Sequence, residues 1–598
     1  MARTAAPYPS RLPAFILAGV VAAIFAFAPG GLARPRQTSE AASPHQPPAG
    51  SASETGHILR VRSRLVVVDV TVTNSHGEPV QGLHQEDFAV FENGRRQPVV
   101  KFQPHVFIPQ VAQRLAVQLP PGEYSNIAPP SSPVPALNII LFDVLNTPMA
   151  AQINGRVRMV QFLKNLPLDQ PTALFELSDH LTMIAGFSTN STDLLAALDK
   201  LSPHKGPFSV SQSDAETQAA RETALAKLVD SGLPAGAQPI LPLEDVGKLL
   251  EERRSFGLGR RVLMTSDAFA ALAQAVEGYP GRKNVLWLSS GFPLRFSPKG
   301  ILTQQGVLPN STAEMLSSAQ VAVFPIDIHG LKVNGPSASS PDQLLAGPGS
   351  SPGDSGQASV ISAKESRLAA SEQMMTQIAS DTGGQAFYNT NDLKSAFRKA
   401  IEDGSTFYTL AYVPPDQHWN GQYRRIKVTL DGRGMHLAYR RGYYAAPWKP
   451  TPAAAAQMFT SAMQPGIPES TMLAFHAKVE PPDATHSALR ITYQVPANDI
   501  AFQDSASRQK RARIEFVSVA YAKDGTRSGV ASQIATLNLQ PAIYQQFLNS
   551  GAIAFHQQLQ LKPGGYDLRL GILDQTTGRF GTIDVALRLA PALASPAR

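Results

Sequence analysis

The chain has 598 residues, enough for about three to four domains, and 43% of them are hydrophobic, an ordinary fraction for a globular protein. Its net charge of +7 is spread over the chain without a long Lys/Arg run, so the composition does not indicate a nucleic-acid-binding surface. The chain contains no cysteine, which excludes disulfides, thiol catalysis and thiolate-bound zinc or iron–sulfur sites.

The N-terminus has the pattern of a secretory signal peptide. Arg3 and Arg11 precede an apolar run over residues 14–28, and Gly31 and Ala33 place small residues at the −3 and −1 positions of a cleavage site before Arg34. The run is shorter than the roughly 20 apolar residues of a membrane-spanning helix, so cleavage is favoured over an uncleaved anchor. We therefore expect an exported protein, periplasmic, envelope-associated or secreted, with no stable transmembrane segment after cleavage.

A β pattern follows the Pro- and Ser-rich stretch 34–56. Val66, Val68, Val70 and Val72 fall at every second position, with Val67, Asp69, Thr71 and Thr73 between and after them, which is the period of a half-buried strand. The pair Asn93-Gly94 separates two further strand-like runs and predicts a tight hairpin. These patterns predict a small β-sandwich module, after which the many prolines before residue 135 indicate a linker.

The stretch from Leu137 to Pro148 is an apolar run that ends in polar residues. Such a run is typical of a strand buried on both faces of a parallel sheet, so Trp287, in a similar later run, is expected in the core. Helix-period stretches alternate with these strands, which predicts a doubly wound, mostly parallel sheet. Asp143, Ser289-Ser290 and Asp327 then follow three strands at one edge, where such sheets bind ligands.

From Thr406 the two-residue period returns, first in short hairpins and then, after a second linker-like stretch, in a series of strand candidates between Met472 and Leu589. The latter predict an antiparallel sandwich of the immunoglobulin or fibronectin kind.

Several of these segments resemble the von Willebrand factor A-related proteins that are abundant in acidobacteria. The resemblance rests on residues 139–147, 281–293 and 321–327, on Thr382-Gly383-Gly384, and on the hairpins over 408–444 that end in Arg440-Arg441-Gly442-Tyr443-Tyr444. It covers about residues 60–445 and implies an α/β plus all-β chain, with a von Willebrand A-type doubly wound, mostly parallel sheet flanked by β-sandwich modules.

The expected organisation is a signal peptide (1–33), a flexible linker (34–56), a small β-sandwich module (57–110), a linker (111–135), a von Willebrand A-like domain (136–405) with insertions at 202–280 and 330–362, a β-hairpin extension (406–447), a linker (448–469) and a C-terminal β-sandwich (470–590).

The resemblance also implies a metal site. In von Willebrand A domains an Asp-x-Ser-x-Ser loop, a Thr from a second loop and an Asp from a third surround Mg²⁺ or Mn²⁺ and leave one position for a partner's carboxylate. Asp143 matches the first ligand and Thr147 the last hydroxyl, and Ser188 or Thr189 could supply the second-loop hydroxyl. Leu145 and Ser290 depart from the pattern. A weak Mg²⁺ or Mn²⁺ site and a hydrogen-bonded sheet edge without metal are therefore both open.

These features predict a non-enzymatic protein-binding or adhesion module with a degenerate metal-ion-dependent adhesion site, whose unidentified protein partner could contribute an acidic side chain. The expected partner-binding residues lie at the polar edge: Asp143, Asn146, Thr147, Ser290 and Phe292. The alternatives are a structural envelope protein without metal and, less favoured, a hydrolase. No catalytic residue is assigned, because Ser289-Ser290-Gly291 lacks the Gly-x-Ser-x-Gly pattern of a nucleophile elbow.

Overall fold

The computed structural model describes residues 65–106, 119–126, 136–165, 170–199, 243–292, 310–329, 355–390, 392–432, 434–445, 450–483, 487–505, 508–549 and 551–589. For residues 165, 243–256, 310–311 and 355–368 it describes only the backbone. The predicted signal peptide and the linker 34–56 lie outside these ranges. Within them, no helix combines the length and the hydropathy that a membrane span requires.

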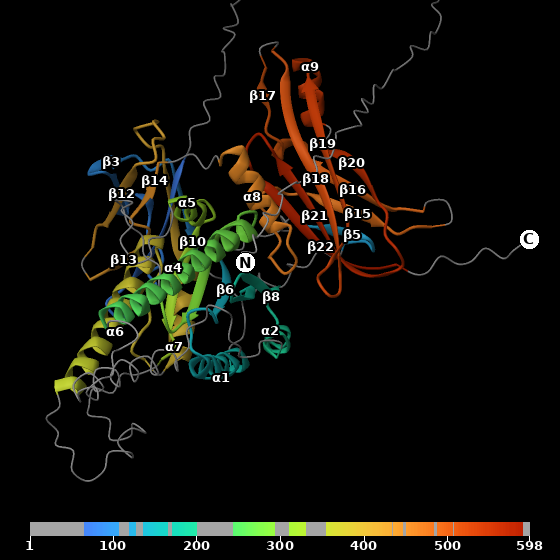
Figure 1. The fold of residues 1–598 in the computed structure, drawn as a ribbon. Coiled ribbons are helices and arrows are strands. Elements are labelled where there is room, and N and C mark those ends of the chain that lie inside the picture. The colour runs from blue at the N-terminus through green and yellow to red at the C-terminus, as the bar shows by residue number, and fades with distance from the viewer. Residues whose placement is uncertain are drawn as a thin grey trace, which may run out of the picture. The chain divides into compact units, whose positions relative to one another are not determined.

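The middle of the chain forms a five-stranded mixed sheet with the order β10-β9-β6-β7-β8 (Figure 1). Its strands are β6 (Ala136–Asp143), β7 (Thr172–Leu177), β8 (Leu181–Ser188), β9 (Arg282–Ser289) and β10 (Val321–Asp327). All neighbours are parallel except β8, which runs antiparallel to β7. Because β7 is added on one side of β6 and β9 on the other, the strand order reverses between β6 and β9.

Helices cover both faces of this sheet. One face packs against α1 (Met149–Asn165), α2 (Ser191–Leu198) and α7 (Leu393–Ser405), and the other against α4 (Leu243–Val276), α5 (Asn310–Ser318) and α6 (Ser355–Thr382). Alternate residues of β6 enter the two cores, Ile139 and Leu141 on the α4 side and Ile140 and Phe142 on the α1 side. The apolar run Ile139 to Phe142 within β6 therefore reflects burial on both faces.

The segments before and after this α/β region together form one β-sandwich. Its sheets have the orders β13-β1-β11-β4 and β14-β12-β2-β3. The strands are β1 (Val66–Thr73), β2 (Phe88–Glu92), β3 (Arg95–Gln97), β4 (Lys101–His105), β11 (Phe407–Tyr412), β12 (Tyr423–Leu430), β13 (His436–Ala438) and β14 (Gly442–Tyr444), and a 3₁₀ turn (Gln85–Asp87) precedes β2.

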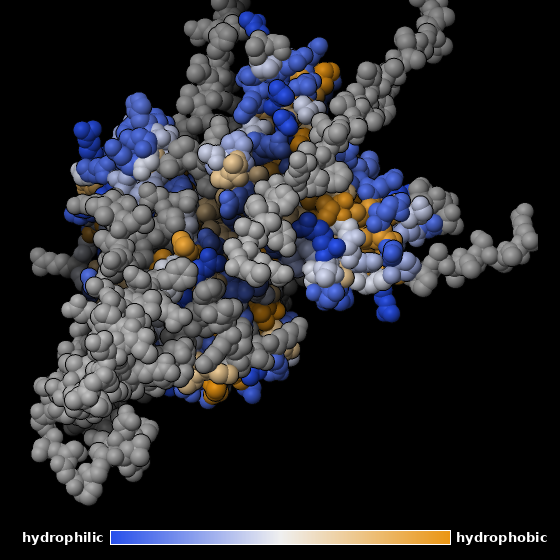
Figure 2. Space-filling model, viewed as in Figure 1, coloured by the Kyte–Doolittle hydropathy of each residue, from blue (hydrophilic) through white to orange (hydrophobic). Residues whose placement is uncertain are grey.

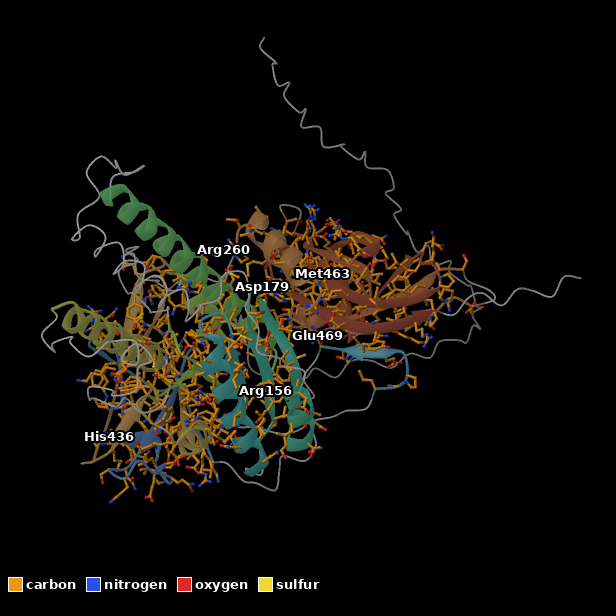
Figure 3. All side chains as sticks on the ribbon, turned by 60° about the horizontal axis from the view of Figure 1, so that its bottom comes forward. Arg156, Asp179, Arg260, His436, Met463 and Glu469 are labelled. Carbon is orange, nitrogen blue, oxygen red and sulfur yellow. The ribbon has the colours of Figure 1, made fainter. Side chains whose placement is uncertain are left out.

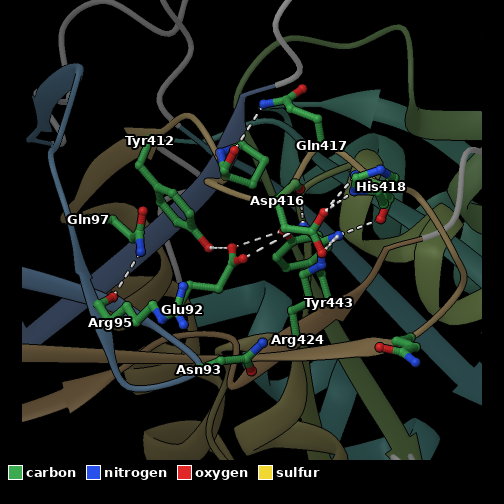
Figure 4. Close-up of polar contacts among 12 residues, drawn as sticks. Glu92, Asn93, Arg95, Gln97, Tyr412, Asp416, Gln417, His418, Arg424 and Tyr443 are labelled. Carbon is green, nitrogen blue, oxygen red and sulfur yellow. Dashed lines mark hydrogen bonds and ion pairs between the residues drawn. The ribbon is translucent and has the colours of Figure 1, made fainter.

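The stretches expected as a separate module (57–110) and a hairpin extension (406–447) thus share one core, in which Val68 and Val90 meet Tyr408 and Ile426. Neither stretch alone could bury its apolar face, because each supplies only part of each sheet. A buried ion pair between Glu92 and Arg424 closes one end of this core (Figure 4).

A second sandwich is formed by the C-terminal region. One sheet has the order β20-β16-β15-β5, and the other the order β17-β18-β21-β22, with β19 also paired to β18. The elements are β5 (Glu123–Ser125), α8 (Pro452–Ala462), β15 (His476–Glu480), β16 (Leu489–Pro496), a 3₁₀ turn (Ala497–Asp499), β17 (Gln503–Asp504), β18 (Lys510–Ala522), β19 (Arg527–Leu539), α9 (Pro541–Asn549), β20 (Ala552–Leu559), β21 (Gly564–Asp574) and β22 (Phe580–Leu589).

Two of these elements lie in stretches expected to be linkers. β5 lies within 111–135 and pairs with β15, more than 340 residues later, so no local pattern could reveal its partner. α8 lies within 448–469, where the prolines favoured a linker. Pro452 instead occupies the first turn of the helix, where its missing N–H costs nothing, and the Thr451 side chain caps the helix by accepting from Ala454 N.

Candidate functional site

The polar ends of β6 and β9 meet at the point where the strand order of the five-stranded sheet reverses. Asp143 is the last residue of β6 and Ser289 the last of β9, and the two strands pair in parallel. In open α/β sheets this is the usual position of a ligand site. The predicted residues Asp143, Asn146, Thr147 and Ser290 do come together here, as their contacts below show.

The Asp143 carboxylate is fully buried, and the groups that donate hydrogen bonds to it belong to this chain. Its Oδ1 accepts from Asn146 N at 2.9 Å, and its Oδ2 accepts from Asn146 Nδ2 at 2.9 Å and from Trp287 Nε1 at 3.0 Å. Burial raises the pKa of Asp143 to about 6, against the opposing effect of these hydrogen bonds. Burial also lowers the pKa of Arg261, and the negative charge of Asp143 partly offsets that shift.

The two loops at this edge are tied directly to each other. Thr147, also fully buried, accepts a hydrogen bond from Ser290 N through Oγ1 at 3.2 Å, and its Oγ1 lies 3.5 Å from Ser289 Oγ. Ser289 Oγ donates to Gly291 O at 2.7 Å, and Ser290 Oγ donates to Asn146 O at 3.4 Å. The hydroxyls of Thr147, Ser289 and Ser290 therefore all contact atoms of these same two loops.

Phe292, predicted to contact a partner, is instead a core residue with 2% of its surface exposed. Its ring packs edge-on against Trp287 with centroids 4.8 Å apart, and Phe269 packs on Trp287 in the same way at 5.0 Å. The aromatic packing holds the indole in place, so that its N–H points at Asp143. Trp287 is thus both a core residue, as expected, and a donor to the site, which sequence reasoning missed.

Ser188 and Thr189, predicted as metal ligands, lie at the opposite end of the sheet. Ser188 pairs with Thr172, which in turn pairs with Asn138, five residues before Asp143. At about 3.3 Å per residue, five residues along β6 place the Ser188 level of the sheet about 17 Å from Asp143. Ser188 Oγ donates to Asp193 Oδ2 and accepts from Asn190 N at the start of α2. The prediction failed because β8 reverses direction, so the loop after it does not return to the Asp143 edge.

The residues at this edge do not fit a divalent cation. A cation needs several oxygen ligands that converge on one point. The second-loop hydroxyls are not at this edge, Asp143 already accepts three N–H bonds, and Thr147 Oγ1 accepts from Ser290 N. In the ranges that the structure describes, no three His, Asp or Glu side chains cluster as metal ligands would. The four predicted ligands are therefore not assembled.

A second polar pair lies at this edge, Asp327, which the sequence offered only as a possible outer-shell carboxylate, and His329. Asp327 ends β10 beside Ser289, and its Oδ1 lies 2.8 Å from His329 Nδ1. The spacing Asp-x-His directly after a buried strand was the available signal. Among the described residues no serine hydroxyl is bonded to His329, since Ser289 and Ser290 donate to backbone carbonyls, so no nucleophile–base pair is formed.

An exposed apolar stripe lies on α1, which begins immediately after this edge. Met149, Ile153 and Val157 are 41%, 48% and 51% exposed, and their spacing of four residues places them on one face. Figure 2 shows apolar side chains at the surface over α1. On a different side of the helix, Arg156 (Figure 3) forms an ion pair of 3.2 Å with Asp199 at the end of α2. The stripe therefore has no part in holding α1 to the sheet.

No known family model matches the sequence. No curated protein matches it. Solved structures do match, and they include an aerotolerance-related membrane protein from Bacteroides fragilis (11% identity, 44% of this chain and 98% of that chain, TM-score 0.23) and BatB from Bacteroides thetaiotaomicron (12% identity, 45% and 98%, TM-score 0.22). The ArnB paralog VWA2 from Sulfolobus acidocaldarius also matches (8% identity, 88% and 76%, TM-score 0.17). At such TM-scores these similarities carry no argument about fold or function.

Proposed function

We propose that this chain is an exported, non-enzymatic protein-binding module with a von Willebrand A-like domain, and that it binds its partner without a divalent cation. The main support for binding without a cation is that the Asp143 carboxylate accepts hydrogen bonds from Asn146 and Trp287 of its own chain. The motif resemblance and the reversal of strand order between β6 and β9 support the domain assignment. The N-terminal sequence pattern supports export.

Because Asp143 is buried, we place the contact with the partner on a neighbouring surface. The Asp143 carboxylate is fully buried and accepts three hydrogen bonds from its own chain, so a partner cannot reach it from solvent without displacing protein atoms. The stripe Met149, Ile153 and Val157 lies next to the Asp143 edge and exposes large apolar side chains, which are enriched where proteins bind other proteins. We therefore assign the contact with the partner to the α1 stripe.

Hydrolysis is the less supported alternative. The pair Asp327–His329 could orient an imidazole, but catalysis would also need a hydroxyl bonded to His329 Nε2. Ser289 and Ser290, the nearest candidates along the paired strands, donate to backbone carbonyls instead.

A capture experiment with the full-length mature protein tests the proposal. Envelope extract of the source organism is passed over immobilised wild-type protein, over the double variant Ile153→Ser/Val157→Ser and over Asn154→Ser, an exposed position on the same helix. We expect a specific protein to be retained equally with Mg²⁺ and with EDTA, retained by Asn154→Ser and lost from the double variant. Loss of capture in EDTA would contradict the metal-free mode, and capture by no variant would favour the purely structural role.

A further inference from the structure

A cavity of about 50 Å³ lies where the first β-sandwich meets the β10 edge of the five-stranded sheet. Its lining comes from β1, β9, α5, β10, the end of α6, β12, Arg440 and β14. A water occupies about 10–15 Å³ of such space, so the cavity holds about three to five waters or one small molecule. It is separate from the Asp143 edge, with which it shares no lining residue.

Among the described residues that line this cavity, one buried polar atom lacks a hydrogen-bond partner, and it is a donor, Arg440 Nε. Arg440 donates through Nη2 to Val67 O at 2.5 Å, but its buried Nε has no hydrogen-bond partner. The hydroxyls of Tyr423 and Ser317 also line the cavity and form no hydrogen bond with another described residue. A buried donor without an acceptor costs about 1–3 kcal/mol, so a ligand that supplies oxygen acceptors would relieve this cost.

The acceptors of the lining are largely engaged. Asp69 accepts from Thr409 Oγ1 at 2.6 Å and from Gln320 Nε2 at 3.1 Å. Asp381 accepts from Gln377 Nε2 at 2.6 Å, and burial raises its pKa to about 6 while Arg441 partly offsets that rise. The unmet demand in the cavity is therefore for acceptor atoms on the ligand.

The charges favour a ligand with a single negative charge. Arg282 is buried beside Asp69 and Asp403, whose charges oppose the lowering of its pKa by burial. Arg440 forms no ion pair with a described carboxylate, and its guanidinium carbon lies 5.8 Å from the centre of the Tyr443 ring, in the same wall as Tyr423. With Asp69 and Asp381 also in the wall, a doubly charged anion such as phosphate would meet repulsion.

The rest of the wall is apolar. Ala313 and Leu316 of α5 and Val321 of β10 supply aliphatic surface. A ligand that fits has an acceptor-rich head and a short aliphatic tail.

We propose that this cavity binds a small monocarboxylate of acetate to butyrate size, with its carboxylate on Arg440 Nε and the hydroxyls of Tyr423 and Ser317, and its alkyl chain against Ala313 and Leu316. The binding residues come from both the sandwich and the α/β region. A bound ligand would therefore contact both the sandwich and the α/β region.

Calorimetry and thermal unfolding of the full-length protein with acetate, butyrate and phosphate, at constant ionic strength set with chloride, test this proposal. We expect butyrate to bind more tightly than acetate, and phosphate not to bind. Loss of one charge-assisted hydrogen bond lowers affinity by about tenfold to a hundredfold, which is the change expected for Arg440→Gln. Arg398→Gln, at an exposed position on α7, is the matched control and should bind as the wild type does.

Tyr423→Phe provides a second variant that removes one hydroxyl and keeps the ring, so it tests the site even if Arg440→Gln does not fold. We expect a several-fold weaker affinity for butyrate in this variant and a stronger affinity at neutral pH in Asp381→Asn, which removes a repelling charge. Absence of carboxylate binding, equal binding in Tyr423→Phe and wild type, or tighter binding of phosphate than of butyrate would each overturn the proposal.

Discussion

Trp287 Nε1 donates a hydrogen bond of 3.0 Å to Asp143 Oδ2, which joins a core residue of β9 to the carboxylate that the sequence pattern assigned to a metal. Phe269 and Phe292 hold the indole edge-on from two sides. Asp143 is thereby a structural carboxylate that fixes the two loops at the switch point of the sheet.

The first prediction concerns the pH dependence of stability. Folding raises the pKa of Asp143 from 3.8 to about 6, so the native state binds more protons than the unfolded state between these pH values. The contribution of Asp143 to the free energy of unfolding therefore falls as pH rises through this window, by about 3 kcal/mol at 1.36 kcal/mol per pKa unit. Urea unfolding of wild type and Asp143→Asn at pH 4 to 7 checks this, because the amide of the variant does not titrate.

We expect the stability of the wild type relative to Asp143→Asn to decline by about 2 kcal/mol between pH 4 and pH 7, most of the full effect. A difference that stays constant with pH would show that the carboxylate titrates normally. Asp143→Ala, which leaves the Trp287 and Asn146 donors without an acceptor, should be less stable than either by about 1–3 kcal/mol per unpaired group.

The second prediction concerns divalent cations. Because the oxygens of Asp143 and Thr147 are bound internally and Ser188 lies at the far end of the sheet, Mg²⁺ and Mn²⁺ should give no saturable heat in titration calorimetry of the full-length protein. Asp143→Ala is the control. Saturable heat in the wild type that disappears in this variant would establish a metal site and refute the closed-edge interpretation.

The sequence was sufficient to predict the local elements of the α/β region. Short apolar runs mark the central parts of β6, β9 and β10, and the structure confirms mixed α/β content with one mixed sheet and several antiparallel sheets. The von Willebrand A-type assignment stays a prediction. The pairing of strands far apart in the chain could not be predicted. β1 pairs with β11 some 340 residues later, and the residue pattern of a strand does not identify its partner strand.

The site was predicted in part for a similar reason. Asp143, Asn146 and Thr147 follow one strand, so their proximity is local, whereas the position of Ser188 depended on the direction of β8, which periodicity does not reveal. Whether Asp143 faced solvent or a donor depended on Trp287, 144 residues further along the chain. Burial of a carboxylate by a distant side chain leaves no mark in its local sequence.

The third prediction concerns the need for glycine in the Thr382-Gly383-Gly384 turn. A Cβ on Gly384 would collide with the carbonyl oxygen of Val323 in β10, and Gly383 has a φ of +84°. Gly384→Ala should therefore destabilise the protein by about 1–3 kcal/mol or more, because the clash is with backbone that cannot move aside. Thermal and urea unfolding measure the change.

The control for Gly384→Ala is Gly186→Ala in β8, where an added Cβ would meet no atom within 4 Å. This substitution should leave stability unchanged or raise it by about 0.5–1 kcal/mol, since alanine loses less backbone entropy on folding. Equal effects at the two positions would show that the close approach at Val323 is not what the turn requires.

The fourth prediction concerns the ion pair at the end of the first sandwich (Figure 4). Glu92 and Arg424, with side chains 3% and 4% exposed, approach to 3.7 Å, and Glu92 Oε2 also accepts from the hydroxyls of Tyr412 at 2.7 Å and Tyr443 at 2.9 Å. Arg424 further donates to Asp416 O and His418 O, each at 2.5 Å, and so holds the loop before β12.

Removal of the arginine leaves Glu92 as a buried charge without its cation. We expect Arg424→Met to cost about 3–5 kcal/mol of unfolding free energy, whereas Arg425→Met, at the exposed neighbouring position of β12, should stay within about 0.5 kcal/mol of wild type. Glu92→Gln keeps an acceptor for the tyrosines, so the double variant Glu92→Gln/Arg424→Met should be less destabilised than the sum of the single changes, because the unpaired charge is gone. Strict additivity in urea unfolding would mean that the two side chains do not interact, and the loop contacts of Arg424 would then account for its whole effect.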